Sequence, residues 1–491
     1  MNIYEHHEIK GWFFLPEDPD NRVPGVLKWD PSDGGSATVE LIGGFLPAEA
    51  TENNMLKRTI YLETVRGEKY SVWDGVSTNS LSNGTKTYEE YWYSNQIYFG
   101  DHILPTDASF TKATFELDEL YYVADDQRIF KPEKGQGKIW EQIGQNSYSR
   151  PFLSFFKLPI LSGNHRGKFT GSTKDAQYSI NTWATHPYPN DSYNHRCGLR
   201  FMISVGANVS VMLRNEGTET GKLAGTASDL IDRFVPIYDL MRLATFQPCG
   251  VANIQLQQHD NEHGSLLVNL GEVARPNEHH EQLDVVFTLN DTSLENFLKE
   301  RERLTNNYGA SEPWNILMGL CGYSSNYMEE YISQSFAAAE GFHKLCLGKG
   351  KKYTNSDGTD TYFLKNRLKE LYLLLPGEIQ AVFNFDVDEW ATLAANARHR
   401  VAHGGPLTRN DSTTLLDRYA FAISVHLVMY LLVLTRLGIL SDNLCDLLIE
   451  HSKIRTMRYY CDDVRSMLET KQKRIYLLKL MQKRIQTMSE E

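Results

Sequence analysis

Two side chains that together can act on a phosphodiester bond lie in the stretch ANARHRVAHGGP, from Ala395 to Pro406. Arg398 and His403 are separated there by four residues. Histidine is the side chain whose proton can move near neutral pH, and arginine can hold a phosphate through two parallel N–H donors. The types of these two residues therefore point to phosphodiester cleavage.

The sequence around this pair predicts a helix that ends at the breaker Gly404-Gly405-Pro406. On an ideal α-helix, five positions turn the chain by about 500°, which places the two side chains about 140° apart. We therefore expect Arg398 and His403 to converge only if the helix frays near His403.

Two other interpretations of the same residues remain open. Arginine and histidine at a helix C-terminus each interact favourably with the helix dipole, by about 0.3–1 kcal/mol, without any catalysis. His399 and His403 are four residues apart and share a helix face, so they could form a metal pair. Since no carboxylate or third histidine lies at a matching spacing, we expect no metal and no cofactor.

The charge of the chain is divided unequally along its length. The 491 residues carry 50 Lys+Arg and 62 Asp+Glu, a net charge of −12. Residues 311–491 contain 22 basic and 21 acidic side chains, so the first 310 residues carry 28 and 41. The acidity therefore lies entirely in the front part, which disfavours bulk attraction of nucleic acid there and suits a basic protein or peptide partner.

Hydrophobic periodicity predicts an α+β fold with two differently built parts. The front shows short, alternating, β-branched and aromatic runs, such as ATVELIGGFL and ATFELDELYYV, which predict a sandwich or barrel. We expect this β-rich domain over residues 1–290, with two lobes of about 1–150 and 151–290 and one helix near 228–243. A helix and linker over 291–313 would lead to an all-helical bundle over 314–491.

Helical spacing of apolar residues predicts the elements of this bundle. The expected helices are Trp314–Leu320, Asn326–Leu347, Phe363–Leu375, Asp388–Ala402, Thr413–Leu437, Asp442–Tyr459 and Val464–Met488.

Several other kinds of site find no support in the sequence. No Gly-rich segment has the phosphate-loop spacing, and neither a GxSxG elbow nor an HExxH helix occurs. The six cysteines form no CxxC pair, and no secretory signal is visible, so we expect a cytoplasmic protein. The uncharged stretch from Tyr419 to Thr435 is 17 residues long, which predicts a buried helix or a dimer seam rather than a membrane span.

A carbohydrate-binding front domain is an alternative that depends on tryptophans in the predicted strands. The candidates are Trp12, Trp29, Trp73 and Trp92. Tryptophans on strands more often form the core, so we favour the core interpretation.

The chain also resembles a known family. The segment RHRVAH, followed by Gly-Gly, is similar to the Arg-x4–6-His motif of HEPN ribonucleases. The segment FAAAEGFHKL, which contains Glu340, looks like the first long helix of the ApeA-like HEPN subgroup. The blocks GWFFLPED, VPGVLKWDP and ELIGGF look like the ApeA N-terminal domain, so the resemblance covers nearly the whole chain.

The resemblance implies a bacterial anti-phage protein that arrests the infected cell. Its HEPN domain would cut RNA without a metal at a homodimer interface, and its N-terminal domain would sense a phage-derived trigger, which we expect to be a protein. Arg398 and His403 match the two motif positions. The family commonly has a polar residue, often Asn, at the position of His399, which is therefore either a third catalytic group or a helper. A catalytically inactive HEPN scaffold for dimerisation or binding is the alternative.

Basic and aromatic residues of the helical part are candidates for holding RNA and a second copy of the chain. Transfer RNA and bulk message are both candidate substrates, and the sequence favours neither. The expected RNA-binding residues are Lys349, Lys351, Lys352, Tyr353, Arg400, Lys473 and Arg474. The expected dimer-interface residues are Tyr419, His426 and Tyr430 on the apolar helix.

Overall fold

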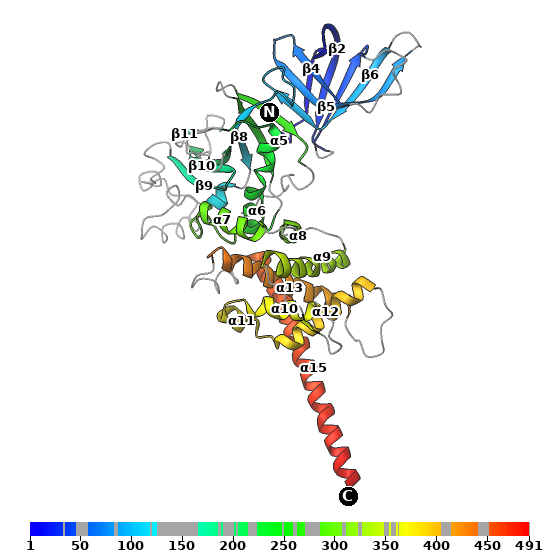
Figure 1. Ribbon diagram of the computed structural model, residues 1–491, viewed down its shortest axis with the longest axis vertical. Helices are drawn as coiled ribbons and strands as arrows, with labels where there is room; N and C mark the ends of the chain where they lie inside the picture. Colours follow the sequence, from blue (N-terminus) through cyan, green and yellow to red (C-terminus); the bar gives the residue numbers. More distant parts are fainter. Residues whose placement is uncertain are drawn as a thin grey trace, which may run out of the picture. The chain divides into compact units, whose positions relative to one another are not determined.

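A computed structural model of the chain divides it into two compact units (Figure 1). The N-terminal unit consists of Met1–Met241, Pro248–Leu283 and Thr288–Glu295. The helical unit consists of Arg242–Gln247, Asp284–Phe287 and Asn296–Glu491. The structure describes all residues except 33–34, 46–56, 83–86, 118–119, 125–164, 185–187, 190–200, 203–204, 215–222, 248–249, 259–262, 271–284, 307–310, 323–326, 348–352, 355–359, 362, 404–413, 440–450 and 491. For some further residues, including 402–403 and 472–490, only the backbone is described.

The front of the chain forms a closed barrel of six antiparallel strands. In spatial order the strands run β4-β1-β2-β3-β6-β5, and β4 pairs with β5 to close the circle. Closure removes the free edges that an open sheet would expose. The strands are β1 His7–Leu15, β2 Asp18–Asp30, β3 Ser36–Ile42, β4 Arg58–Thr64, β5 Lys69–Ser82 and β6 Thr87–Ser94.

Three of the four candidate tryptophans belong to the core of this N-terminal unit. Trp29, Trp73 and Trp92 are each 1% exposed, whereas Trp12 is 45% exposed. The indole N–H of Trp29 donates to Ile3 O at 2.8 Å. This burial confirms the core interpretation for Trp29, Trp73 and Trp92, whereas Trp12 lies at the surface.

Further strands continue the same sheet beyond the barrel. β5 also pairs with β7, and the order then runs β7-β15-β14-β8-β13-β10-β9, which gives a sheet of 13 strands. A separate small pair is formed by β11 Tyr188–Pro189 and β12 Phe201–Met202. The added strands are β7 Gln96–Phe99, β8 Phe110–Leu117, β9 His165–Ser172, β10 Ala176–Ala184, β13 Val205–Leu213, β14 Val251–Gln258 and β15 His263–Val268.

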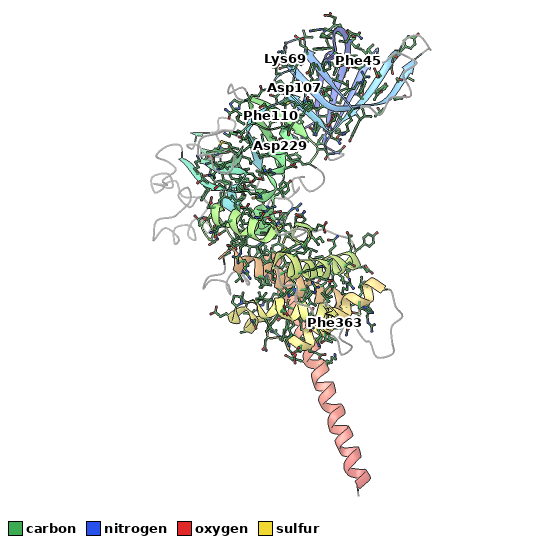
Figure 2. All side chains as sticks on the ribbon, viewed as in Figure 1. Phe45, Lys69, Asp107, Phe110, Asp229 and Phe363 are labelled. Carbon is green, nitrogen blue, oxygen red and sulfur yellow. The ribbon has the colours of Figure 1, made fainter. Side chains whose placement is uncertain are left out.

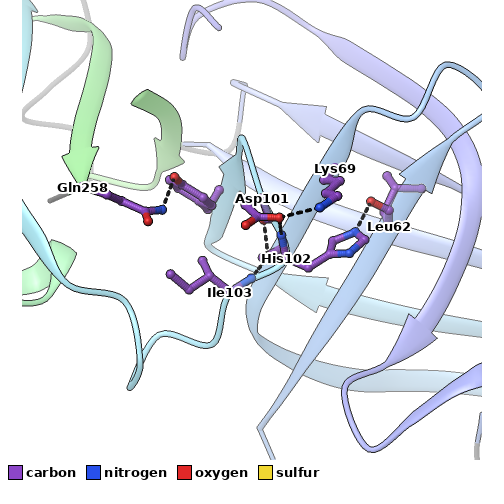
Figure 3. A network of polar contacts seen from close by, with 8 residues as sticks. Leu62, Lys69, Asp101, His102, Ile103 and Gln258 are labelled. Atoms are coloured by element: carbon purple, nitrogen blue, oxygen red, sulfur yellow. Dashed lines mark hydrogen bonds and ion pairs between the residues drawn. The ribbon is translucent and has the colours of Figure 1, made fainter. Parts of the chain in front are cut away.

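A polar network fixes the segment that follows β7 against the barrel (Figure 3). Lys69 Nζ donates to Asp101 Oδ1 at 2.8 Å, and this hydrogen bond lowers the pKa of the Asp101 carboxyl. The backbone N–H of His102 donates to the same oxygen, and the His102 ring contacts Leu62 O at 3.0 Å. Burial lowers the pKa of His102, so this ring is neutral near pH 7.

Short helices pack beside the added strands. Phe110, which is labelled in Figure 2, lies at the start of β8. It is fully buried and exchanges backbone hydrogen bonds with Gly225. The single helix expected near 228–243 is instead two helices, because the chain turns at Arg233. Thr226 and Asp229 form a capping box at the start of the first of the two helices, α5. The helices are α1 Leu120–Ala124, α5 Ala227–Asp232, which carries this box, and α6 Val235–Thr245.

The back of the chain is helical, as expected, and the α+β fold class is confirmed. The helices are α7 Leu294–Thr305, α8 Ser311–Cys321, α9 Met328–Gly341, α10 Leu364–Leu373, α11 Gly377–Phe383, α12 Val387–His403, α13 Leu415–Arg436 and α15 Ser452–Glu490. A π-helical turn, η4 Phe342–Cys346, continues α9, and a small hairpin pairs β16 Tyr353–Thr354 with β17 Asp360–Thr361.

Two expected helices of the bundle differ from the observed ones. A break was expected between Tyr459 and Val464, but α15 is continuous there because no glycine or proline interrupts it. The short helix α11, Gly377–Phe383, lies between two expected helices and was not itself expected. It begins directly after Pro376 and ends at Asn384, which adopts the left-handed conformation (φ 49°).

The apolar helix α13 lies in the core of the helical unit. Its length and composition would suffice to cross a membrane, but 83% of its most apolar window is buried inside the protein. Thr414 and Asp417 form a capping box at its start. The expectation of a buried bundle helix is therefore confirmed.

Candidate active site

Helix α12 carries the motif, and its first turn is fixed by polar contacts. The side chain of Asp386 accepts a hydrogen bond from the backbone N–H of Glu389 at 3.1 Å, as an N-cap does. Lys369 on α10 pairs with Asp388 at 2.8 Å, and Lys471 on α15 pairs with Glu389. These ion pairs connect the start of α12 to two neighbouring helices.

The buried face of α12 holds the helix against α13. Trp390, Ala391, Ala394 and Ala397 are all at most 4% exposed and recur at helical intervals. The indole N–H of Trp390 donates to Ser424 Oγ on α13 at 3.0 Å, inside the core. Small alanines beside one large indole allow the two helices to approach closely, so the direction in which α12 points its motif is set by this packing.

The motif residues occupy different sides of α12. Asn396 and His399 are exposed, and both share a helix face with the position of His403. Arg398 is partly buried and lies four residues after Ala394, on the flank of the buried face. Because α12 stays helical through His403, the Arg398 and His403 positions are about 140° apart within one chain.

The described backbone is helical through His403, so it does not show the fraying near His403 that convergence of the two side chains within one chain would need. The side chain of His403 and residues 404–413 lie outside the described part of the chain, so the contacts of this histidine are not placed. One chain by itself brings His399 and His403 to one face, but does not bring Arg398 to that face.

The expected RNA-binding residues are only partly described. Lys349, Lys351 and Lys352 lie outside the described residues, and Tyr353 is placed by its backbone alone, in β16. Arg400 on α12 is partly exposed. Lys473 and Arg474 lie on α15 with undescribed side chains, two and three residues after Lys471, which pairs with Glu389.

Two of the three expected dimer-interface residues are interior. His426 and Tyr430 are 1% and 0% exposed, because residues of the same chain already cover them. Their assignment to a dimer seam is corrected by this burial, since a partner could not reach them without unpacking the helical unit. Tyr419 is partly exposed and packs between Tyr331 and Tyr460, with ring centroids 5.2 and 5.6 Å away.

His426 is held neutral in the core. Its Nδ1 is 2.7 Å from Tyr331 Oη, and its Nε2 is 3.8 Å from Cys321 Sγ. Burial, assisted by the nearby charge of Lys453, lowers the pKa of His426 to about 3. The sequence alone suggested an interface role for this histidine because an apolar helix does not reveal which of its faces the chain itself covers.

We expect His426 to make the helical unit less stable in acid. Its pKa is about 3 when folded and ordinarily near 6.5 when unfolded, so only the unfolded chain binds this proton between those values. The stabilisation is complete above about pH 6.5 and is lost as the pH falls towards 3. From pH 7 to 5 the loss from this residue is about 2 kcal/mol. The unfolding free energy of the His426→Gln variant should lack this component, and an unchanged pH dependence would contradict the assignment.

A second polar cluster, not recognised in the sequence, joins α9 and η4 to α10. His343 is 1% exposed, and its Nε2 lies 2.7 Å from Glu370 Oε2. Arg367 is 2% exposed and donates to Glu340 O at 3.1 Å. The available signal in the sequence was the i, i+3 spacing of Glu340 with His343 and of Arg367 with Glu370. These two contacts connect α9 and η4 to α10.

A metal centre finds no support in the parts of the chain that the structure describes. No group of three or more His, Cys, Asp or Glu side chains is placed there so as to hold an ion. The three cysteines with described side chains, Cys321, Cys346 and Cys461, are buried thiols that are not joined in disulfides. Burial raises the pKa of Cys346 to about 12, which keeps this thiol protonated and unreactive.

Comparison with known protein families assigns both parts of the chain. A family model for ApeA N-terminal domain 1 matches residues 8–150 and 192–301, which together are more than half of the chain. A model for Apea-like HEPN matches residues 322–443, a range that includes the Arg398–His403 motif. No curated protein and no solved structure matches the chain.

Proposed function

Because the chain belongs to the ApeA-type anti-phage HEPN family, we propose that its helical unit is a metal-independent endoribonuclease. The observation that carries this proposal is the position of Arg398 and His403 at the end of α12, inside the HEPN match. The N-cap of Asp386 and the buried hydrogen bond of Trp390 fix the first turn of α12, the helix that presents the pair.

The proposed reaction needs only what RNA and these side chains supply. The 2′-OH of RNA lies next to the phosphorus that it attacks, so the enzyme has to move protons and stabilise charge. His403 takes the proton of the 2′-OH or protonates the 5′ oxygen as it leaves. Arg398 stabilises the additional negative charge on the pentacoordinate phosphorus. The products are a 2′,3′-cyclic phosphate and a 5′-OH.

His399 is proposed as a contributor to the same site. It is exposed and shares a face with the position of His403, so a phosphate that contacts one histidine lies within reach of the other. A protonated His399 would add positive charge beside the phosphate. Whether it transfers a proton or orients the substrate is decided by the pH dependence of cleavage.

A homodimer is the proposed active form. The positions of Arg398 and His403 project about 140° apart on one helix, and a twofold axis can place the arginine of one copy beside the histidine of another. Since His426 and Tyr430 are interior, the interface has to use other residues, and Tyr419 remains the candidate with partial exposure. An active species that sediments as a monomer would contradict this arrangement.

The N-terminal unit is proposed to sense the infection signal in the cytoplasm. The first 310 residues carry 28 basic and 41 acidic side chains, a charge that favours a basic phage protein over RNA as the trigger. RNA binding by Arg400, Lys473, Arg474 and the loop around Tyr353 stays a prediction. A front domain exchanged for that of a relative should change the trigger and leave the cleavage chemistry unchanged.

The proposed function is tested by cleavage of RNA in EDTA. The full chain is incubated with total RNA, alone and with extract of phage-infected cells, and the new ends are analysed. We expect cleavage in EDTA with 2′,3′-cyclic phosphate and 5′-OH ends. Cleavage that requires a divalent metal would contradict the mechanism. RNA binding without cleavage, both alone and with the extract, would favour the inactive scaffold.

A further inference from the structure

Two short segments from the front half of the sequence complete the helical unit. Arg242–Gln247, which is the last turn of α6 and the two residues after it, belongs to the helical unit, as does Asp284–Phe287. The residues before and after each segment belong to the N-terminal unit. The match to the N-terminal family domain nevertheless covers both segments. The packing of these residues therefore differs from their family assignment.

The segment 242–247 is packed deeply against α13. Leu243 is fully buried, and Phe246 is 5% exposed. The hydroxyl of Tyr430 donates to Leu243 O at 2.6 Å, and the rings of Phe246 and Tyr430 have centroids 4.4 Å apart. The Phe246 ring also lies 6.1 Å from His426. The two interior residues of α13 that sequence suggested for a dimer are thus covered by this segment.

The backbone of Phe246 is in a conformation that its own preferences do not favour. Its φ is 55°, in the left-handed region that residues other than glycine rarely adopt. The N–H of Phe246 donates to Arg242 O at 2.9 Å, and the N–H of Val286 donates to Ala244 O at 2.7 Å. The contacts around residues 242–247 therefore keep the Phe246 backbone in this conformation. If the segment shifted, the backbone could return to a preferred conformation and the ring would leave its position.

A continuous series of contacts leads from this segment to the motif helix. Tyr430 and His426 contact the segment, and Ser424, on the same helix, accepts the hydrogen bond of Trp390 at 3.0 Å. Residues 424 and 430 are about 9 Å apart along α13. Since the indole of Trp390 connects α12 to Ser424, a displacement of α13 can reach the helix that carries Arg398.

We propose that residues 242–247 are the element through which the N-terminal unit acts on the helical unit. These residues are continuous with α6, whose first seven residues, Val235–Met241, belong to the N-terminal unit. A movement of α6 therefore changes how Phe246 and Leu243 seat on α13, and α13 passes the change to α12. The use of this coupling to switch cleavage depends on the proposed function, whereas the coupling itself does not.

Hydrogen exchange of the full chain tests the contact with α13. Tyr430→Phe removes only the hydroxyl that donates to Leu243 O, and Tyr372→Phe is the matched control because its hydroxyl donates to Gln380 O at 3.0 Å. We expect Tyr430→Phe to speed exchange about tenfold in α13, in α12 and at the end of α6 together. The control should affect α10 and α11 only. Faster exchange confined to α13 would overturn the proposal.

Transmission from the N-terminal unit is tested by a second pair of variants. Ile237 on α6 and Ile180 on β10 are both fully buried in that unit. Ile237→Ala should speed exchange in α13, whereas Ile180→Ala should leave α13 unchanged. Equal effects of the two variants on α13 would overturn the proposal.

These exchange measurements are independent of catalysis. They are made in proteins that also carry His403→Ala. This substitution removes the proposed catalytic histidine and, with it, any RNA cleavage that would harm the cells producing the protein. If the exchange of the helices is not coupled, the proposal of this subsection fails and the proposed nuclease is unaffected. If the exchange is coupled but the natural chain does not cut RNA, only the proposed function fails.

Discussion

Replacement of His403 by alanine is expected to lower RNA cleavage by the full chain by about 10²- to 10⁴-fold, the usual contribution of a general acid or base. The physical reason is that no other described side chain on the same face of α12 except His399 can move a proton near neutral pH. The rate is measured with excess enzyme on a labelled RNA in EDTA, so that product release does not mask the chemical step.

The control for this variant is Asn396→Ala. Asn396 is exposed, lies on the same face of α12, and cannot titrate. The variant should retain cleavage. If His403 only interacts with the helix dipole, its loss costs about 0.3–1 kcal/mol of stability and changes the rate little. Full cleavage by the His403→Ala protein would therefore show that the histidine is structural.

Replacement of Trp390 by alanine is expected to destabilise the helical unit by about 3–5 kcal/mol. Trp390 is fully buried, so its removal leaves a cavity, and Ser424 loses the indole N–H that donates to it. Because a chain with two units need not unfold in one step, the measurement is hydrogen exchange of α12 and α13 rather than one thermal midpoint. Cleavage should fall together with the protection of α12.

Trp12→Ala is the matched control for Trp390→Ala. Trp12 is 45% exposed, so the same truncation creates no closed cavity, and its effect should stay within about 1 kcal/mol and within the N-terminal unit. The contrary result would be that α12 and α13 are protected from hydrogen exchange as strongly in Trp390→Ala as in the natural chain. That result would contradict the role of the indole in fixing the motif helix.

Local patterns were sufficient for much of the fold. Alternating apolar residues predicted the strands of the front, and helical spacing predicted α12 and α13 within a few residues of their observed ends. The break expected between Tyr459 and Val464 was wrong, because neither glycine nor proline interrupts α15 there. The candidate motif could also be found in the sequence, since it is contained in six consecutive residues of one element.

The sequence by itself therefore determined the β-rich front, the helical back, the motif and the family resemblance, all of which depend on residues close together in the chain. The tertiary structure alone decided the rest. It closed the barrel through β4 and β5, placed His426 and Tyr430 inside, and packed Phe246 into the helical unit. Such contacts join residues far apart in sequence, and periodicity reports which face of a helix is apolar but not which part of the chain covers it.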